Sequence, residues 1–206
     1  ATRFIGIVAV AVGLAVVLQA KVWLARAGQS ALVGPLLVAV IVRELGPLLV
    51  NFIVIGRSGT AIATELASMR VAGEIEVLDA QGLDPLAYLV PPRAVGSALT
   101  VLCLTVFFIA LSLASGFLGG WLLGAQMGPA GAFLDSVFGA MNGADLFNLL
   151  AKSFVPGWLM AVICSEEGLS VRGALTDVPQ AASRAVTRSV AALFVVSAFV
   201  SAMTYL

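Results

Sequence analysis

Five long apolar runs constrain this chain more than any other feature of its sequence. A helix needs about 20 consecutive apolar residues to cross the hydrocarbon core of a bilayer. The runs lie at about residues 4–20, 31–56, 94–124, 146–164 and 190–206. The fourth is interrupted by Lys152, Pro156 and Gly157. We therefore expect an all-α integral membrane protein with about five transmembrane helices, in which residues 1–206 form a single transmembrane domain.

The composition excludes several other classes of protein. Hydrophobic residues make up 61% of the chain and charged residues 11%, whereas about a quarter of the residues in a soluble domain are charged. Lysine plus arginine and aspartate plus glutamate balance at 11 each, so no basic excess favours nucleic acid as a partner. The absence of histidine removes the commonest general base and zinc ligand, so we expect neither a catalytic residue nor a metal site. Cys103 and Cys164 stand alone in apolar runs and are interpreted as small buried hydrophobic residues.

The distribution of lysine and arginine outside the runs predicts the orientation, because cytoplasmic segments carry an excess of these residues. Segments 57–93 and 165–189 contain three arginines each, whereas segment 125–145 contains two aspartates and no basic residue. We expect the first two in the cytoplasm and the third outside, which places the N-terminus in the cytoplasm. Lys21 and Arg26, between the first two runs, disagree with this scheme.

Two charged residues, Arg43 and Glu44, stand in the middle of the second apolar run. A charge at that depth costs at least about 2.5–3.5 kcal/mol, so each needs compensation. Adjacent helical side chains diverge, so we expect their partners elsewhere. Pro47 removes a backbone hydrogen bond and should kink the helix here. We interpret Arg43, Glu44 and Pro47 as part of a substrate cavity; the alternative is an interhelical ion pair that only locks the bundle.

Three glycines, Gly116, Gly120 and Gly124, repeat at every fourth position near the end of the third run. Small residues at this spacing allow two helix backbones to approach closely. We therefore expect a helix-packing face, directed either at another span of the same chain or at a second copy of it.

The polar stretch 65–79, between the second and third runs, has a helical period in its apolar residues. This pattern predicts one amphipathic cytoplasmic helix, ended by Gly82. Because the helix is net acidic, docking to a protein partner is favoured over binding to anionic headgroups. The alternative is a solvated connector. The residues assigned to the docking surface are Glu65, Met69, Arg70, Glu74, Glu76 and Asp79.

After this stretch, Asp84 and Pro85 have the N-cap and first-turn pattern of another short helix. We expect Pro91 and Pro92 to break that helix before the third span.

The chain contains no Gly-x-x-x-x-Gly-Lys-Ser/Thr loop of the kind that binds nucleotide phosphates. It cannot hydrolyse a nucleotide by itself, and we expect it to bind no cofactor. If it takes part in active transport, ATP and Mg²⁺ belong to a separate ATPase subunit.

The order of motifs from residue 43 to residue 93 resembles the central signature of the MlaE/YrbE permeases of MCE-type ABC transporters. The similar stretches read RELGPL at 43–48, GRSGTAIATEL at 56–66, MRV at 69–71 and GLDP at 82–85. The likeness extends over nearly the whole chain, from the second run to the last residue. One departure lies at 173–186, where the family has a glycine-rich turn and this chain reads TDVPQAASRAV from residue 176.

The resemblance implies a homodimeric permease in the bacterial inner membrane that moves glycerophospholipids between the inner and outer membranes and so maintains outer-membrane lipid asymmetry. It implies three partners: an ABC ATPase subunit, an MCE-domain ring protein on the periplasmic face, and a small STAS-type accessory protein. Helix 65–79 would be the element coupled to the ATPase. Arg43 and Glu44 would belong to the lipid cavity.

Two hypotheses from other classes stay open on the residues alone. In the first, the chain is a secondary transporter or channel in which Arg43 and Glu44 carry a proton or an ion. Such a protein would show gradient-driven flux without an ATPase. In the second, it is a scaffold whose buried charges only lock helices together.

Overall fold

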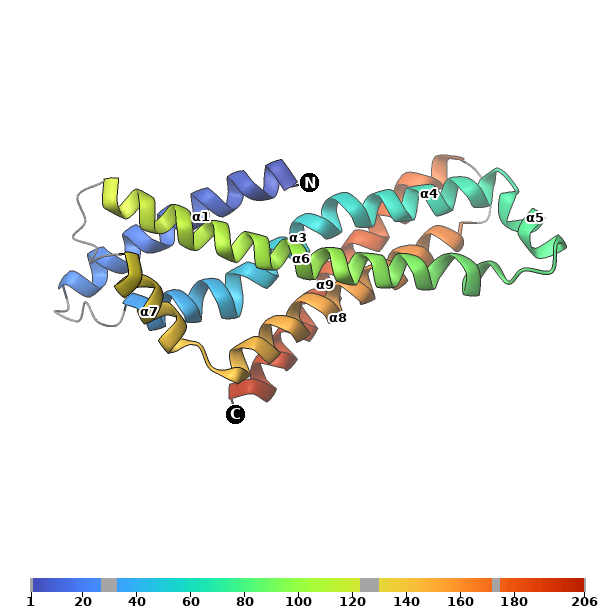
Figure 1. Cartoon of the computed structure of the whole chain (residues 1–206). Helices are drawn as coiled ribbons and strands as arrows, with labels where there is room; N and C mark the ends of the chain where they lie inside the picture. Colours follow the sequence, from blue (N-terminus) through green and yellow to red (C-terminus); the bar gives the residue numbers. More distant parts are fainter. Residues whose placement is uncertain (1, 27–32, 123–129, 172–174, 206) are drawn as a thin grey trace. The chain divides into compact units, whose positions relative to one another are not determined.

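A computed structural model of the chain describes residues 2–26, 33–122, 130–171 and 175–205, and these residues form helices and no β-strand. Five helical segments are long and apolar enough to cross a membrane. They are Thr2–Ala20, Pro35–Val71, Pro85–Leu122, Gly143–Leu169 and Val178–Thr204. The prediction of an all-α membrane protein with five spans is therefore confirmed (Figure 1).

The second span is the irregular one, because two π-helical segments, η2 and η3, interrupt it. The elements in chain order are α1 (Thr2–Arg26), α2 (Val33–Leu37), η2 (Val38–Leu45), α3 (Gly46–Val54), η3 (Ile55–Gly59), α4 (Thr60–Val71), α5 (Glu74–Ala80), α6 (Pro85–Leu122), α7 (Ala130–Ala140), α8 (Gly143–Leu169), the 3-10 turn η4 (Leu175–Asp177) and α9 (Val178–Tyr205). The chain divides into two compact units, and the division falls inside α3, α6 and α8.

Unit 1 comprises Ala1–Val50 and Cys103–Ala151. Its core is an aliphatic cluster contributed by α1, α2, η2, α6, α7 and α8. The fully buried members include Val17, Leu37 and Ile41. In Figure 1, α1 lies along the second half of α6. A Cβ atom on Gly13 of α1 would lie 2.0 Å from the Ser112 carbonyl oxygen of α6, so only glycine permits this approach.

The predicted glycine face lies partly on this contact. A Cβ atom on Gly116 would lie 2.3 Å from Val17 of α1, so Gly116 faces another span of the same chain. Gly120 is buried on the same helix, and Gly124 lies outside the described residues. The other glycine of α6 against α1 is Gly119, whose Cβ would lie 1.8 Å from Leu14 Cδ2.

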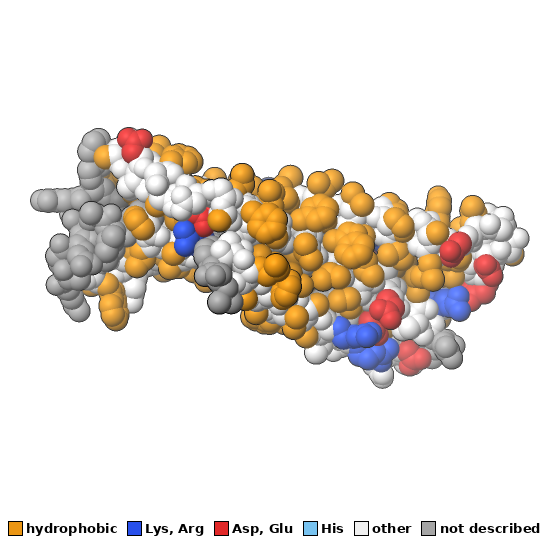
Figure 2. Space-filling model, turned by 90° about the horizontal axis from the view of Figure 1, so that it is seen from below, with side chains coloured by type: hydrophobic (Ala, Val, Ile, Leu, Met, Phe, Trp, Pro, Cys, Tyr) orange, Lys and Arg blue, Asp and Glu red, His pale blue; other side chains and the backbone are white. Residues whose placement is uncertain are grey.

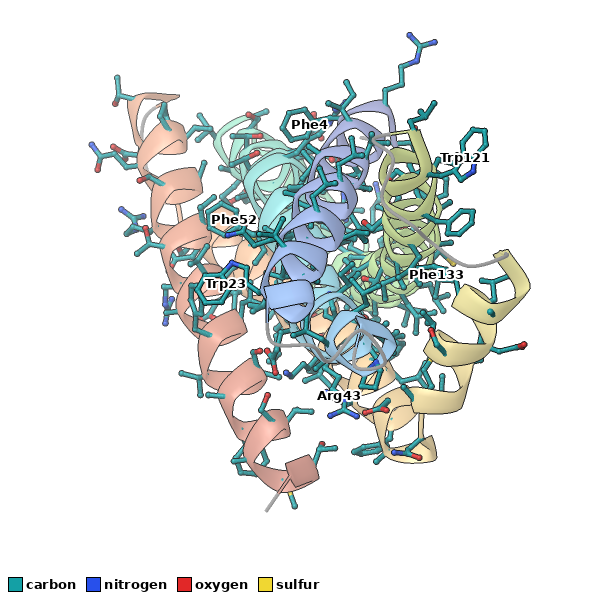
Figure 3. The ribbon with its side chains drawn as sticks, turned by 90° about the vertical axis from the view of Figure 1, so that its left-hand side faces the viewer. Phe4, Trp23, Arg43, Phe52, Trp121 and Phe133 are labelled. Carbon is teal, nitrogen blue, oxygen red and sulfur yellow. The ribbon has the colours of Figure 1, made fainter. Side chains whose placement is uncertain are left out.

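Aromatic side chains project from the ends of two helices of unit 1. Trp23 is 70% exposed near the end of α1, and Trp121 is 63% exposed near the end of α6. Figure 3 shows both pointing away from their helices. Exposed tryptophans at the ends of apolar helices are typical of the interface between a bilayer and water.

Unit 2 comprises Asn51–Leu102 and Lys152–Leu206. Here α4 packs on α9, and the end of α8 lies against α4 so closely that a Cβ atom on Gly168 would be 2.7 Å from the Ala63 carbonyl oxygen. Cys164 is fully buried in this unit, as predicted. The prediction was wrong for Cys103, which is exposed on α6 of unit 1. On a membrane helix an outward apolar side chain can be covered by lipid instead of protein.

The helix predicted over 65–79 is in fact two helices. α4 ends at Val71 and α5 begins at Glu74, because Gly73 between them has a left-handed φ of 78°. A left-handed residue ends a helix, and glycine adopts this conformation without steric cost. The apolar residues keep a helical period across this break because both helices contribute to one apolar cluster, α4 with Leu66 and α5 with Ile75.

The predicted break at Pro91 and Pro92 was also wrong, because α6 runs unbroken from Pro85 to Leu122. The two prolines are its seventh and eighth residues and lie on an exposed face. The carbonyls that lose their donors belong to Ala87 and Tyr88, which are also exposed, so water can bind them. The start was predicted correctly: the Leu86 N–H donates to Asp84 Oδ1 at 3.0 Å, so Asp84 caps this helix.

Candidate transport and coupling sites

The helix winding changes immediately before the predicted irregularity at Gly46 and Pro47. In η2 the hydrogen bonding is of the π type, and the Gly46 N–H donates to the Ile41 carbonyl five residues earlier. A Cβ atom on Gly46 would lie 2.8 Å from that oxygen and 2.9 Å from Ile109 Cγ1 of α6. Short π segments are often found at functional sites, because they turn side chains out of the regular helical register.

Arg43, which lies in η2, binds Asp145 near the start of α8. Arg43 Nε lies 2.7 Å from Asp145 Oδ1, and Arg43 Nη2 donates to Oδ2 at 3.2 Å (Figure 3 labels Arg43). The Asp145 side chain is 1% exposed, whereas that of Arg43 is 27% exposed. The two-pronged pairing compensates a charge at membrane depth. As predicted, Arg43 has a partner on another helix.

Asp145 is positioned by the first turn of α8. It is the third residue of that helix, and its Oδ2 also accepts the Asn142 N–H at 2.9 Å. A carboxylate that reaches back from the third residue to the capping residue is half of a capping box, and the helix dipole favours it there. The sequence placed Asp145 in an external connection; it lies in unit 1 with Arg43.

A buried asparagine lies beside this ion pair. Pro47 has no N–H to give to the Arg43 carbonyl four residues earlier. The Asn148 Nδ2 of α8 donates to that carbonyl over 3.5 Å, a long hydrogen bond. Glu44 is half-buried and Pro47 is buried. Unit 1 thus brings all three residues of the predicted substrate site near the start of α8.

Unit 2 has the same arrangement around a second proline. Pro156 lies inside α8 and has no N–H for the Lys152 carbonyl four residues earlier. Asn51 Nδ2, from the second span, donates to this carbonyl at 3.0 Å. Asn51 and Lys152 are both 1% exposed. A buried lysine in a membrane-spanning helix is a functional-site candidate, which the sequence registered only as an interruption.

The predicted docking surface lies at one end of unit 2, beside a groove of about 940 Å³. The groove is bounded by the end of α4, by α5, by the start of α6 and by the end of α8. Arg70, Glu76 and Asp79 line it, so three of the six predicted docking residues share this surface. The other lining residues are Ile75, Asp84, Pro85, Leu86, Ala87, Val90, Pro91, Val162, Glu166, Leu169 and Ser170.

The groove is acidic with an apolar lining. Among the described lining residues, the one cation is Arg70, which lies 3.1 Å from Glu76. With Asp79, Asp84 and Glu166 these residues include four carboxylates, for a net charge of −3. This charge agrees in sign with the net acidic character predicted for segment 65–79.

The remaining three predicted docking residues lie outside the groove lining. Glu65, on α4, binds Arg93 of α6 at 2.8 Å, with its side chain 58% exposed. Met69 is half-buried in the apolar cluster under α5, and Glu74 is exposed in the first turn of α5.

A family model for the permease MlaE matches residues 1–203. The chain belongs to the MlaE permease family. It is 31% identical over 185 residues to the chloroplast protein Trigalactosyldiacylglycerol 1 of Arabidopsis thaliana, covering 89% of this chain and 52% of that protein. It is 31% identical to a probable ABC transporter permease protein of Rickettsia conorii, covering 86% and 68%, and 33% identical to one of Synechocystis, covering 84% and 65%. The chain thus spans between about half and two thirds of these relatives.

The MlaE-family chain is a multi-pass membrane protein. Two of its segments predicted in the cytoplasm, 57–93 and 165–189, both belong to unit 2. Val171 packs with Ala67, and Glu166 shares the groove with Glu76. Figure 2 shows acidic and basic side chains gathered beside a field of hydrophobic ones.

Sequence reasoning missed one charged cluster in this MlaE-family chain. Glu167, near the end of α8, is 8% exposed and binds both Arg184 and Arg188 of α9. The arginines were recognised only as orientation signals. The sequence did hold a sign of the pairing: Arg184 and Arg188 are four residues apart and therefore share a helix face, which one acidic residue can bridge.

Proposed function

We propose that this chain is the membrane subunit of an ABC transporter that moves phospholipid. The observation that carries the proposal is the Arg43–Asp145 pair, a partly exposed guanidinium held by a buried carboxylate inside apolar spans. Charge is expensive at this depth and is kept where a polar group must be bound. The relatives' names support the class: two are called ABC transporter permeases, and one bears the name of a galactolipid.

In this proposal Arg43 meets the phosphate of a lipid headgroup. Two of its guanidinium nitrogens face Asp145, and its side chain is 27% exposed, so an anionic oxygen can approach it. Glu44 supplies a negative charge in the next position, which suits a headgroup that carries an amine beside its phosphate. Pro47 fixes the irregular backbone that presents the two side chains.

The energy comes from a separate ABC ATPase, which binds ATP and Mg²⁺ and docks on the surface around α5. An acidic groove with apolar sides suits a partner segment that carries basic and apolar residues. Glu65, Met69, Arg70, Glu74, Glu76 and Asp79 form or flank this surface. Gly73 and Gly82, with φ of 78° and 79°, fix the turns at both ends of α5 and hold it beside the groove.

Membership of the family supports the rest of the proposed assembly. The transporter is a homodimer of this chain in the bacterial inner membrane, with its N-terminus in the cytoplasm. It joins an MCE-domain ring on the periplasmic face and a small STAS-type accessory protein on the ATPase side. Glycerophospholipid moves between inner and outer membranes, and outer-membrane lipid asymmetry depends on this movement.

The test is purification of the complex in mild detergent, followed by mass spectrometry of its subunits and bound lipid. We expect one ATPase per copy of this chain and a bound glycerophospholipid. The variant Glu76→Lys with Asp79→Lys should lower ATPase recovery at least fivefold. The matched control is Asp135→Lys, because Asp135 is an exposed carboxylate on α7 of unit 1 and is not part of the groove lining. A protein that purifies without an ATPase and passes ions down a gradient in liposomes would establish the secondary transporter instead.

A further inference from the structure

α9 has an exposed face that changes from basic to apolar along its length. Of the five spans α9 is the least buried, with 17% of its most apolar stretch covered by the rest of the chain. Arg184 and Arg188 are exposed near its start. On the same face follow Val195, Phe199 and Met203, which are spaced four residues apart and are between 63% and 71% exposed.

The two arginines are held side by side by one buried carboxylate. Glu167 Oε2 accepts Arg184 Nε at 3.2 Å, and Glu167 Oε1 accepts Arg188 Nη1. Two guanidiniums one helical turn apart would repel each other without it. Their side chains remain 53% and 58% exposed, so each keeps outward N–H donors. These three side chains carry a net charge of +1, and the exposed Glu166 also attracts Arg188.

We propose that this face binds an anionic phospholipid of the surrounding bilayer. Its phosphate lies between the guanidiniums of Arg184 and Arg188, and an acyl chain lies along Val195, Phe199 and Met203. At about 1.5 Å per residue, Val195 is about 10 Å and Phe199 about 16 Å along the axis from Arg188. The hydrocarbon half of one leaflet is about 15 Å thick, so headgroup and chain match the change from basic to apolar.

Charge and position favour a lipid over other occupants of this face. A soluble anion would pair with the arginines but leave the apolar side chains uncovered. A second copy of the chain would cover the apolar surface, but a two-fold contact along α9 sets this helix against its own copy, which contains no acidic residue to pair with the arginines. An anionic lipid satisfies both halves, and clustered arginines at a membrane surface bind such headgroups.

The test is native mass spectrometry of the full chain in detergent with added phosphatidylglycerol or phosphatidylcholine. We expect phosphatidylglycerol to bind several-fold more tightly. Arg184→Gln should weaken it about fivefold, the effect of roughly one charge at a membrane surface, without changing phosphatidylcholine binding. Arg93→Gln is the matched control, because Arg93 also pairs with a glutamate in unit 2 but lies on α6.

Three results would overturn the proposal. Equal losses in Arg184→Gln and Arg93→Gln would show attraction by net charge alone. Displacement of the lipid by millimolar inorganic phosphate would show a site for free anions. A change in oligomeric state with Phe199→Ser, at unchanged lipid binding, would show that a second copy occupies this face.

Discussion

The two units place their polar groups differently around the same backbone device. In each, a proline inside a helix deprives a carbonyl of its donor, and a buried asparagine from another helix donates to that carbonyl. Unit 2 makes this bond at 3.0 Å, between Asn51 and Lys152, and unit 1 at 3.5 Å, between Asn148 and Arg43. In both spans, therefore, an asparagine side chain supplies the hydrogen bond that the proline removes, so the proline can be kept in an apolar environment.

The units differ in where charge is kept. Unit 1 joins the partly exposed Arg43, in the π segment η2 of the second span, to the buried Asp145 in the first turn of α8. Unit 2 gathers its ion pairs near helix ends, around α5 and the start of α9. The comparison teaches that unit 1 suits contact with a polar group at membrane depth, and unit 2 suits contact with partners at the membrane surface.

The largest expected effect is on the ion pair of unit 1. Arg43→Ala leaves Asp145 buried without this partner, and should lower the free energy of unfolding by about 3 kcal/mol. Arg70→Ala in unit 2 removes an ion pair with Glu76, in which both side chains are more than a third exposed. This change should lower the free energy of unfolding by about 1 kcal/mol or less. Unfolding in mixed micelles with increasing dodecyl sulfate measures both. Equal losses would contradict the difference between the units.

A slightly smaller effect is expected where glycine permits close helix packing in unit 1. Gly13→Ala places a Cβ atom 2.0 Å from the Ser112 main chain, so α1 must move away from α6, at a cost of about 2 kcal/mol. Gly119→Ala is the matched control, because its Cβ meets Leu14 Cδ2, which can rotate. A thermal scan in detergent should order them, with Gly13→Ala clearly less stable. The reverse order would place the rigid contact elsewhere.

Each asparagine should matter less when its proline is removed. Asn51→Ala should cost about 1 kcal/mol, and Pro156→Ala returns an N–H to the Lys152 carbonyl. In a double-mutant cycle, the cost of Asn51→Ala should fall in the Pro156→Ala background. The same cycle with Asn148 and Pro47 should give a smaller coupling, because that bond is longer. A coupling of zero in unit 2 would remove the role assigned to Asn51.

The smallest effect is expected at the turn between α4 and α5. Gly73→Ala forces an L side chain into φ of 78° and should cost roughly 1 kcal/mol or less. Gly96→Ala is the control, because a Cβ atom there meets no neighbouring atom and alanine favours the helix. The affinity for the ATPase should fall in Gly73→Ala and remain unchanged in Gly96→Ala. Unchanged affinity in both would show that the position of α5 is not critical.

Periodicity and charge were enough to predict the spans and the need of Arg43 for a distant partner. They could not identify Asp145, because the pairing joins residues 102 positions apart and only the fold brings these together. The break at Gly73 was missed because the apolar period continues through packing of α5 on α4. The π segments were missed because an apolar run has the same composition whether its main-chain hydrogen bonds join residues four or five positions apart.

The most direct measurement is ATP-driven phospholipid transfer by the full chain reconstituted with its ATPase in liposomes. The decisive variant is Arg43→Met with Asp145→Asn, because removing both charges avoids an unpaired buried carboxylate. We predict that this variant still binds the ATPase and hydrolyses ATP but transfers phospholipid at least about tenfold more slowly. Transfer at the wild-type rate would contradict the assignment of the ion pair in unit 1 to the lipid.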